Sequence, residues 1–205
     1  MRVAVRYSTA RAARRRNRAA TWIEGSLWAL GYTAIACCAF VWGRAAYDQK
    51  QGEWDLNHLA GKTAAMPRNT EGSLVGRIEI PRLNVSAVVF EGTTEGTLAR
   101  GVGHLRGSSG PGERGNVVLA GHRDTFFREL RGIREGDEVT VRGPTGEFHY
   151  QVDSTAIVNP DQTEVLKPGR AATLTLITCY PFRYIGSAPQ RFIVRASITA
   201  MRSNM

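Results

Sequence analysis

One cysteine near the C-terminal end of the chain occupies a position that suits a nucleophile. Cys179 ends the alternating run Thr173–Cys179, and Tyr180 and Pro181 follow it directly. Because a proline cannot continue a central β ladder, the strand should end near Cys179. A cysteine at the end of a strand is held firmly by the sheet and faces the space that the next loop encloses.

A histidine and an arginine are expected near this cysteine. His122 follows the short apolar run 116–120, and its neighbours Gly121 and Arg123 indicate a loop close to the surface. Arg191 begins the last strand-like run, immediately after the loop that leaves Cys179. The end of one strand lies beside the start of the next in an antiparallel hairpin, so Arg191 should lie near the thiol.

A thiol, an imidazole and a guanidinium together can transfer an acyl group. An ordinary thiol has a pKa of about 8.5, so only a few per cent is thiolate at neutral pH, and a cationic Arg191 or His122 nearby favours the thiolate. Attack on an amide carbonyl forms an oxyanion, which Arg191 and a backbone N–H near Cys179 can bind. His122 can protonate the leaving amine and then accept a proton from the incoming nucleophile.

Other side chains compete for these roles. Cys179 is the only cysteine outside residues 25–43, and an inert cysteine buried in the core is the competing interpretation. His104 can line the groove or have a purely structural role. Arg195 should lie about 13 Å along the strand from the arginine at its start, too far from the thiol. Asp124 could orient the imidazole as a carboxylate does in a catalytic triad, but it lies two residues further along the same loop, so we do not assign it this role.

The sequence predicts no cofactor and no metal site. A set made of Cys179, His122 and His104 lacks a short ligand spacing such as Cys-x-x-Cys. Glu113 and Asp161 lie on expected loops and are the candidates for calcium, but exposed acids are mostly solvated. Calcium therefore stays a possible ligand that no pattern in the sequence supports.

Short strands make up the chain from residue 73 onward. Each strand-like run is followed by a turn signal, residues 143–146 form a hairpin loop, and only two brief helices are expected, around 94–99 and 125–130. This spacing predicts an all-β fold, a closed antiparallel β-barrel of about seven or eight strands. The expected strands are 74–80, 84–91, 116–120, 137–142, 147–158, 173–179 and 191–199, with a long loop over 98–115.

An apolar segment near the N-terminus can cross a membrane. Residues 25–43 carry no charge and, as a helix, reach about 28 Å, roughly one hydrocarbon core. The arginines before this segment place the N-terminus in the cytoplasm by the positive-inside rule. Two alternatives remain: a helix buried in a soluble core, and a cleaved signal peptide whose new N-terminal residue, Cys37, can carry a lipid.

These patterns divide the chain into four parts. We expect a basic cytoplasmic arm over 1–24, a transmembrane anchor over 25–43, a spacer over 44–72 and a catalytic domain over 73–205. Residues 1–43 hold +6 of the formal net charge of +9, so the domain itself is only mildly basic. With no basic cluster or nucleic-acid motif in the domain, nucleic acid is excluded as a partner.

The motif around the cysteine resembles that of a known family. Thr-Leu-Ile-Thr-Cys at 175–179 matches the sortase signature Thr-Leu-x-Thr-Cys, and the resemblance runs from about residue 73 to 200. The segments 111–127 and 179–194 are similar to class D sortases in particular. The resemblance therefore implies a sortase-like barrel behind a membrane anchor.

The resemblance also implies roles for individual residues. Cys179 is implied as the nucleophile, His122 as the acid and base, and Arg191 as the arginine that binds the oxyanion or the substrate. Thr178 stands where the family has the residue whose backbone amide is implied in the oxyanion site. The implied reaction is cleavage after Thr in an LPxTG-like sorting signal of an exported protein, followed by transfer of the acyl group to an amine on the cell envelope. The implied membrane anchor adds membrane lipid as a further partner.

Two other functions stay open at this point. A hydrolase can form the same acyl-enzyme and pass it to water, and three catalytic residues do not encode the second substrate. An exported adhesion or scaffold barrel with a buried Cys179 needs no catalysis at all. A papain-like protease is excluded, because its cysteine precedes its histidine, whereas His122 here comes 57 residues before the cysteine.

Overall fold

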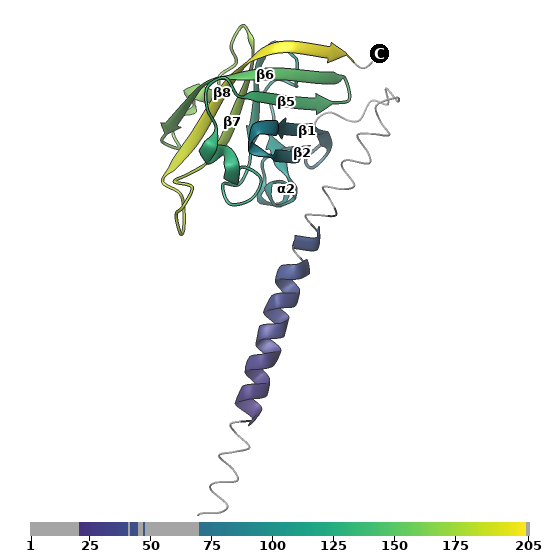
Figure 1. Cartoon of the computed structure of the whole chain (residues 1–205), viewed down its shortest axis with the longest axis vertical. Coiled ribbons are helices and arrows are strands. Elements are labelled where there is room, and N and C mark those ends of the chain that lie inside the picture. The colour runs from purple at the N-terminus through teal and green to yellow at the C-terminus, as the bar shows by residue number, and fades with distance from the viewer. Residues whose placement is uncertain (1–20, 41, 45–46, 48–69, 204–205) are drawn as a thin grey trace, which may run out of the picture. The chain divides into compact units, whose positions relative to one another are not determined.

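The computed structural model describes residues 21–40, 42–44, 47 and 70–203 (Figure 1). The chain separates into two compact units, Met1–Arg44 and Ala45–Met205. Most of the expected arm and most of the expected spacer lie outside the described residues.

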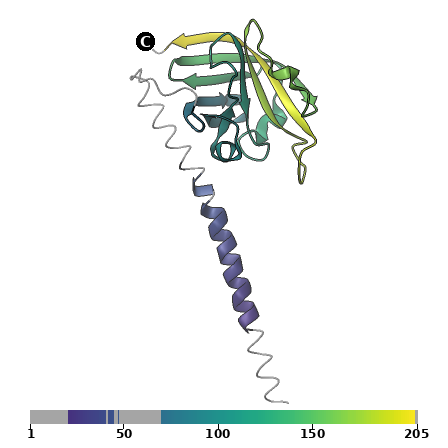
Figure 2. The ribbon, with the colours of Figure 1, turned by 180° about the vertical axis from the view of Figure 1, so that it is seen from behind.

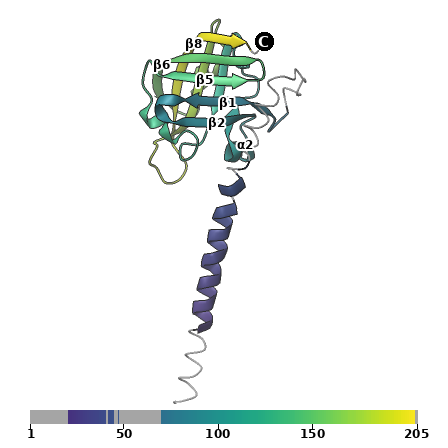
Figure 3. The ribbon, with the colours of Figure 1, turned by 45° about the vertical axis from the view of Figure 1, so that its right-hand side comes forward.

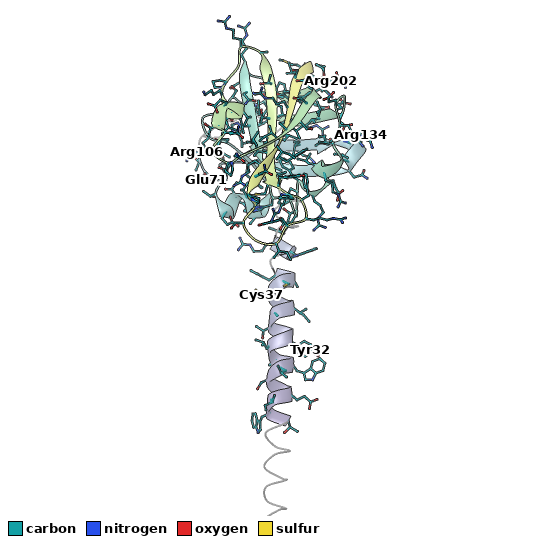
Figure 4. All side chains as sticks on the ribbon, turned by 90° about the vertical axis from the view of Figure 1, so that its left-hand side faces the viewer. Tyr32, Cys37, Glu71, Arg106, Arg134 and Arg202 are labelled. Atoms are coloured by element: carbon teal, nitrogen blue, oxygen red, sulfur yellow. The ribbon has the colours of Figure 1, made fainter. Side chains whose placement is uncertain are left out.

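The described residues of the N-terminal unit form a helix, Thr21–Arg44, which is long and apolar enough to cross a membrane. At 1.5 Å per residue its 24 residues extend about 36 Å. Tyr32 and Cys37 project from the helix in Figure 4, and Tyr32 is 66% exposed. The hydroxyls of Ser26 and Thr33 donate to the carbonyls of Trp22 and Ala29, so their polar atoms are satisfied within the helix. The predicted helix is confirmed.

The second unit is a closed β-barrel, as predicted (Figures 1 and 3). Its strands follow the order β1-β2-β3-β4-β7-β8-β6-β5 around the barrel. The strands are β1 Leu74–Ile80, β2 Val85–Glu91, β3 Val102–His104, β4 Gly115–Ala120, β5 Glu138–Gly143, β6 Gly146–Val158, β7 Ala172–Tyr180 and β8 Gln190–Ser203.

Two of the strand pairings in the described barrel are parallel, whereas the sequence predicted an antiparallel sheet. The pairs β2–β3 and β4–β7 run parallel, and the other six pairs are antiparallel. A parallel pair needs a crossover connection. Helix α2, Glu95–Arg100, provides it between β2 and β3, and the β5–β6 hairpin is part of the long connection from β4 to β7. The expected loop over 98–115 missed the three-residue strand β3.

Helix α2 is anchored by a carboxylate from outside the helix. Thr94 caps its N-terminus, and Glu71 Oε1 accepts hydrogen bonds from the hydroxyls of Thr97 and Thr94 at 2.7 and 2.8 Å. The bond from Thr97 contributes most to lowering the pKa of Glu71, and the bond from Thr94 lowers it further. Figure 4 labels Glu71 and Arg106 on the same side of the barrel, and the charge of Arg106 adds a smaller effect in the same direction.

Three short 3-10 helices lie within residues 70–203, the part of the barrel unit that forms one continuous described segment. The expected helix around 125–130 is one of them, shifted to Arg128–Gly132. The other two were not expected, and both lie in connections between strands. They are η1 Pro81–Leu83 and η3 Thr163–Leu166, and the shifted helix is η2.

The barrel interior holds one hydrophobic core, and β7 separates this core from the outer surface. Leu174 and Leu176 on β7 belong to the core, together with Val194 and Ala196 of β8. Because side chains alternate along a strand, Cys179 faces the outside of the barrel wall. The alternation predicted for β7 therefore holds in the structure.

Candidate active site

The end of β7 lies beside the start of β8, and this pairing joins two of the expected site residues. Cys179 is the direct register partner of Arg191 in the antiparallel β7–β8 ladder. Directly opposed residues in such a ladder have Cβ atoms about 5 Å apart. Cys179 is partly exposed, so the thiol is not sealed within the core.

The end of β4 lies on the other side of β7. The parallel β4–β7 register keeps a constant offset of 57 residues, from Gly115 opposite Ala172 to Ala120 opposite Ile177. The N–H of Gly121 continues the ladder by donating to the carbonyl of Ile177 at 3.1 Å. His122 thus leaves β4 at the level where Cys179 ends the signature on β7.

Two close contacts fix the direction in which the chain leaves β4. Thr178 is 2% exposed, and its Oγ1 donates to the carbonyl oxygen of Gly121 at 2.7 Å. A Cβ atom added at Gly121 would lie 2.7 Å from the ring of Phe127, so only glycine fits there without a shift. The sequence had suggested a role for the backbone of Thr178 but gave no sign of this side-chain bond.

The guanidinium of Arg191 is held by two backbone carbonyls that precede it in the chain. Nη1 donates to the carbonyl oxygens of Gln190 at 2.9 Å and of Ala188 at 3.1 Å. The nitrogens Nε and Nη2 make no hydrogen bond with any residue that the structure describes. Arg191 is therefore oriented by one nitrogen and can offer the other two to a ligand.

His122 is partly exposed and lies near an acidic side chain that the sequence did not single out. Its imidazole side chain is 32% exposed, and Nε2 lies 3.9 Å from Oε1 of Glu95 on α2. Asp124, the considered alternative, is exposed and makes no hydrogen bond to His122 in the described structure. Nothing in the sequence indicated that Glu95, at the start of a short helix, would lie near His122.

A cavity of about 320 Å³ opens on the outer face of β8, the face that also carries Arg191. Along β8, side chains alternate, so Ile193 and Arg195 share the face of Arg191. Arg195 is register partner of Thr175, well away from the thiol, as the sequence suggested. The cavity is lined by Ser154 and Ala156 of β6, Glu164 and Val165 of η3, and Ile193 and Arg195 of β8.

The remaining candidates have structural contacts. His104 is buried and its Nδ1 lies 2.8 Å from the carboxylate of Glu91, while Nε2 lies 2.9 Å from the carbonyl of Ser109. The structural interpretation of His104 is thus confirmed. Glu113 accepts a hydrogen bond from the N–H of Gly110 in its own turn. Among the described residues, no group of three or more His, Cys, Asp or Glu side chains is arranged to hold a metal ion.

Comparison with known proteins identifies the family. Residues 78–199, more than half of the chain, match the family model of the sortase domain. The chain belongs to the sortase family. Sortases are cysteine transpeptidases, and the resemblance drawn from the signature at 175–179 is confirmed.

The most similar relatives include class D sortases. Sortase D of Bacillus subtilis is 40% identical over 134 residues, which cover 65% of this sortase and 68% of that protein. Sortase A of Bacillus anthracis is 26% identical over 63% of this chain and 62% of its own length. The solved structure of a sortase D transpeptidase from Clostridium perfringens superposes with a TM-score of 0.66 at 26% identity, covering 77% of this chain and 99% of that one. This sortase is therefore class D-like.

Proposed function

We propose that this sortase cleaves an LPxTG-like sorting signal after Thr and transfers the acyl group to an amine on the cell envelope. Cys179 attacks the Thr carbonyl, the bond to the next residue breaks, and a thioester forms on the sulfur. His122 gives a proton to the leaving amine and later takes one from the incoming amine. The single observation that carries the proposal is the Cys179–Arg191 register pair, which ends beside the loop of His122.

Arg191 is suited to the oxyanion by its remaining donors. Because Nη1 is bound to the carbonyls of Ala188 and Gln190, Nε and Nη2 are oriented before the substrate arrives. Donors that need no reorganisation are the effective ones for charge that develops during reaction. The backbone amide near Thr178 is the second proposed donor.

The cavity on β8 suits the apolar residue of the sorting signal. Ile193 and Arg195 lie about 7 and 13 Å along β8 from Arg191. The Leu of an extended Leu-Pro-x-Thr peptide lies three residues, or about 10 Å, from the Thr. The distance therefore matches a Leu that enters the 320 Å³ cavity while the Thr carbonyl reaches Arg191.

The proposed location is the outer face of the cell membrane. The helix Thr21–Arg44 supplies a single span, and the seven arginines before residue 19 favour a cytoplasmic N-terminus. The barrel then lies outside the cytoplasm, where exported proteins bearing sorting signals pass. A reporter that is active only outside the cytoplasm, fused after residue 205, should be active in cells, and an inactive fusion contradicts this orientation.

A mass-spectrometric experiment tests the reaction. The full chain in mild detergent, mixed with an LPxTG-type peptide, should form a thioester adduct at Cys179. Cys179→Ala should abolish the adduct, and His122→Ala and Arg191→Ala should nearly do so, whereas the surface control Arg131→Ala should not. An adduct that persists in the Cys179→Ala protein overturns the assignment. Added amines then distinguish transfer from the alternative, hydrolysis.

A further inference from the structure

One side chain from a distant part of the chain binds three backbone carbonyls of the loop between β7 and β8, residues 181–189, while Phe182 at the start of this loop packs against the core. Arg123 Nη1 donates to the carbonyl of Pro181 at 3.0 Å. Its Nη2 donates to the carbonyls of Tyr184 at 2.8 Å and Gly186 at 3.1 Å. Within the described structure these are the only hydrogen bonds that residues 181–187 make.

The tip of this loop presents apolar surface to solvent. Ile185 is fully exposed and Tyr184 is 48% exposed. The loop projects beyond the strand ends in both Figure 1 and Figure 2. The guanidinium of Arg123 also lies 5.8 Å from the centroid of the Tyr184 ring. An exposed loop of this length would sample many conformations without such contacts.

Arg123 connects two segments that each carry a site residue. It follows His122 directly, and the loop that it binds starts two residues after Cys179 and ends just before Arg191. A guanidinium presents several donors in a rigid plane, so it can hold three carbonyls at once. Arg123 therefore fixes the loop against the segment that bears the proposed acid and base.

We infer that Arg123 is a positioning residue, and that by holding the β7–β8 loop as a wall of the site it sets how the acyl-enzyme divides between amine and water. This inference rests on the proposed function. An amine nitrogen attacks the thioester carbonyl, the C–S bond breaks, the thiolate returns to Cys179, and the proton lost by nitrogen passes to His122. Water follows the same path and yields a carboxylic acid.

A fixed wall favours the amine for two reasons. It orients a bulky acceptor near the thioester, and it restricts the access of water. When the loop is released, the orientation of the amine is lost while water, which is small, reaches the carbonyl more easily. Formation of the thioester depends on residues positioned by the β4–β7 and β7–β8 ladders, so it should change less.

The test compares Arg123→Gln and Arg123→Lys in the full chain in mild detergent, with an LPxTG-type peptide and triglycine as the amine. In Arg123→Gln the ratio of transfer to hydrolysis should fall about tenfold, the effect of losing roughly one charged hydrogen bond. The rate of thioester formation in a single turnover should fall no more than about threefold. Tryptic cleavage after Arg183, which is exposed in the loop, should become faster, and Arg123→Lys should lie between, since an ammonium lacks the planar fork.

Matched measurements separate this role from a charge effect. The control Arg131→Gln removes a surface arginine that pairs with Glu129 and should leave the ratio and the cleavage after Arg183 unchanged. Full rescue by Arg123→Lys, together with a shifted pH profile of thioester formation in Arg123→Gln, overturns the inference in favour of a charge effect. An unchanged ratio despite faster cleavage after Arg183 also overturns it. If wild type forms no thioester, the proposed function fails, and the inference about partitioning fails with it, whereas the rate of cleavage after Arg183 still reports whether Arg123 holds the loop.

Discussion

Thr178 and Gly121 are joined by a hydrogen bond of 2.7 Å from the threonine hydroxyl to the glycine carbonyl. Each residue directly precedes a proposed catalytic residue, Cys179 or His122. The bond therefore ties the end of β7 to the point where the chain leaves β4. It explains in physical terms why a threonine suits the position before the cysteine.

Replacing this threonine by an isosteric apolar residue should reduce catalysis. Thr178→Val keeps the shape but leaves the Gly121 carbonyl without its donor, a loss of about 1–3 kcal/mol for a buried acceptor. If the displaced loop carries the same cost into the transition state, thioester formation slows about tenfold or more. Thr178→Ser keeps a hydroxyl and should stay close to wild type. Single-turnover acylation measures both, and wild-type rates in Thr178→Val contradict the proposed coupling.

A lysine at position 191 should not be able to perform the proposed function of Arg191. It cannot bind the carbonyls of Ala188 and Gln190 and still offer two oriented donors to an oxyanion. We expect kcat for peptide cleavage to fall about 100-fold in Arg191→Lys, with a smaller change in KM. Arg202→Lys, at the far end of the same strand, is the matched control and should keep the wild-type kcat. A loss confined to KM would instead mean that Arg191 binds substrate without stabilising the transition state.

Filling the cavity on β8 should weaken peptide binding. Val165 lines the cavity from η3 and is partly buried. Val165→Arg places a long charged side chain where the Leu of the peptide is proposed to enter, so KM for an LPxTG-type peptide should rise about tenfold or more. The ratio of transfer to hydrolysis should stay constant, because the acceptor side is untouched. An unchanged KM contradicts the proposed path of the peptide.

The sequence predicted what depends on local pattern. The bounds of the first strand, Leu74–Ile80, match the structure, and the proximity of Cys179 to Arg191 follows from a hairpin whose strands are neighbours in sequence. Alternation correctly separated the inner and outer faces of β7. Each of these features is determined by a few consecutive residues or by a short connection.

Features that depend on distant segments were not predicted. The parallel β4–β7 pairing joins residues 57 apart, and nothing in the local periodicity of either strand states which neighbour it has. Strand β3 has only three residues, one of them Gly103, too few for a periodic signal. The three carbonyl contacts of Arg123 depend on the conformation of loop 181–189, which composition does not specify.

An ion pair away from the site should control the acid stability of the barrel. Asp137, 7% exposed, accepts hydrogen bonds from Nε and Nη2 of Arg82 and from the N–H of Arg134. The bond from Arg82 comes first among the causes that lower the pKa of Asp137 below its ordinary value of 3.8. A carboxyl whose pKa is lower in the folded state stabilises the fold above the unfolded pKa. That stabilisation is lost as the pH falls through the folded pKa.

Asp137→Asn should therefore lower the free energy of unfolding at pH 7 by about 1–3 kcal/mol, since it removes hydrogen bonds to a charged group. The difference from wild type should persist down to about pH 4 and shrink below 3.8, where the carboxyl of the unfolded wild-type chain takes up a proton before the folded one does. Urea unfolding of the full chain in detergent between pH 7 and pH 3 measures this. Glu129→Gln, which breaks the exposed pair with Arg131, should cost less than about 1 kcal/mol. A difference between Asp137→Asn and wild type that stays constant to pH 3 would show that the charge of Asp137 is not the cause.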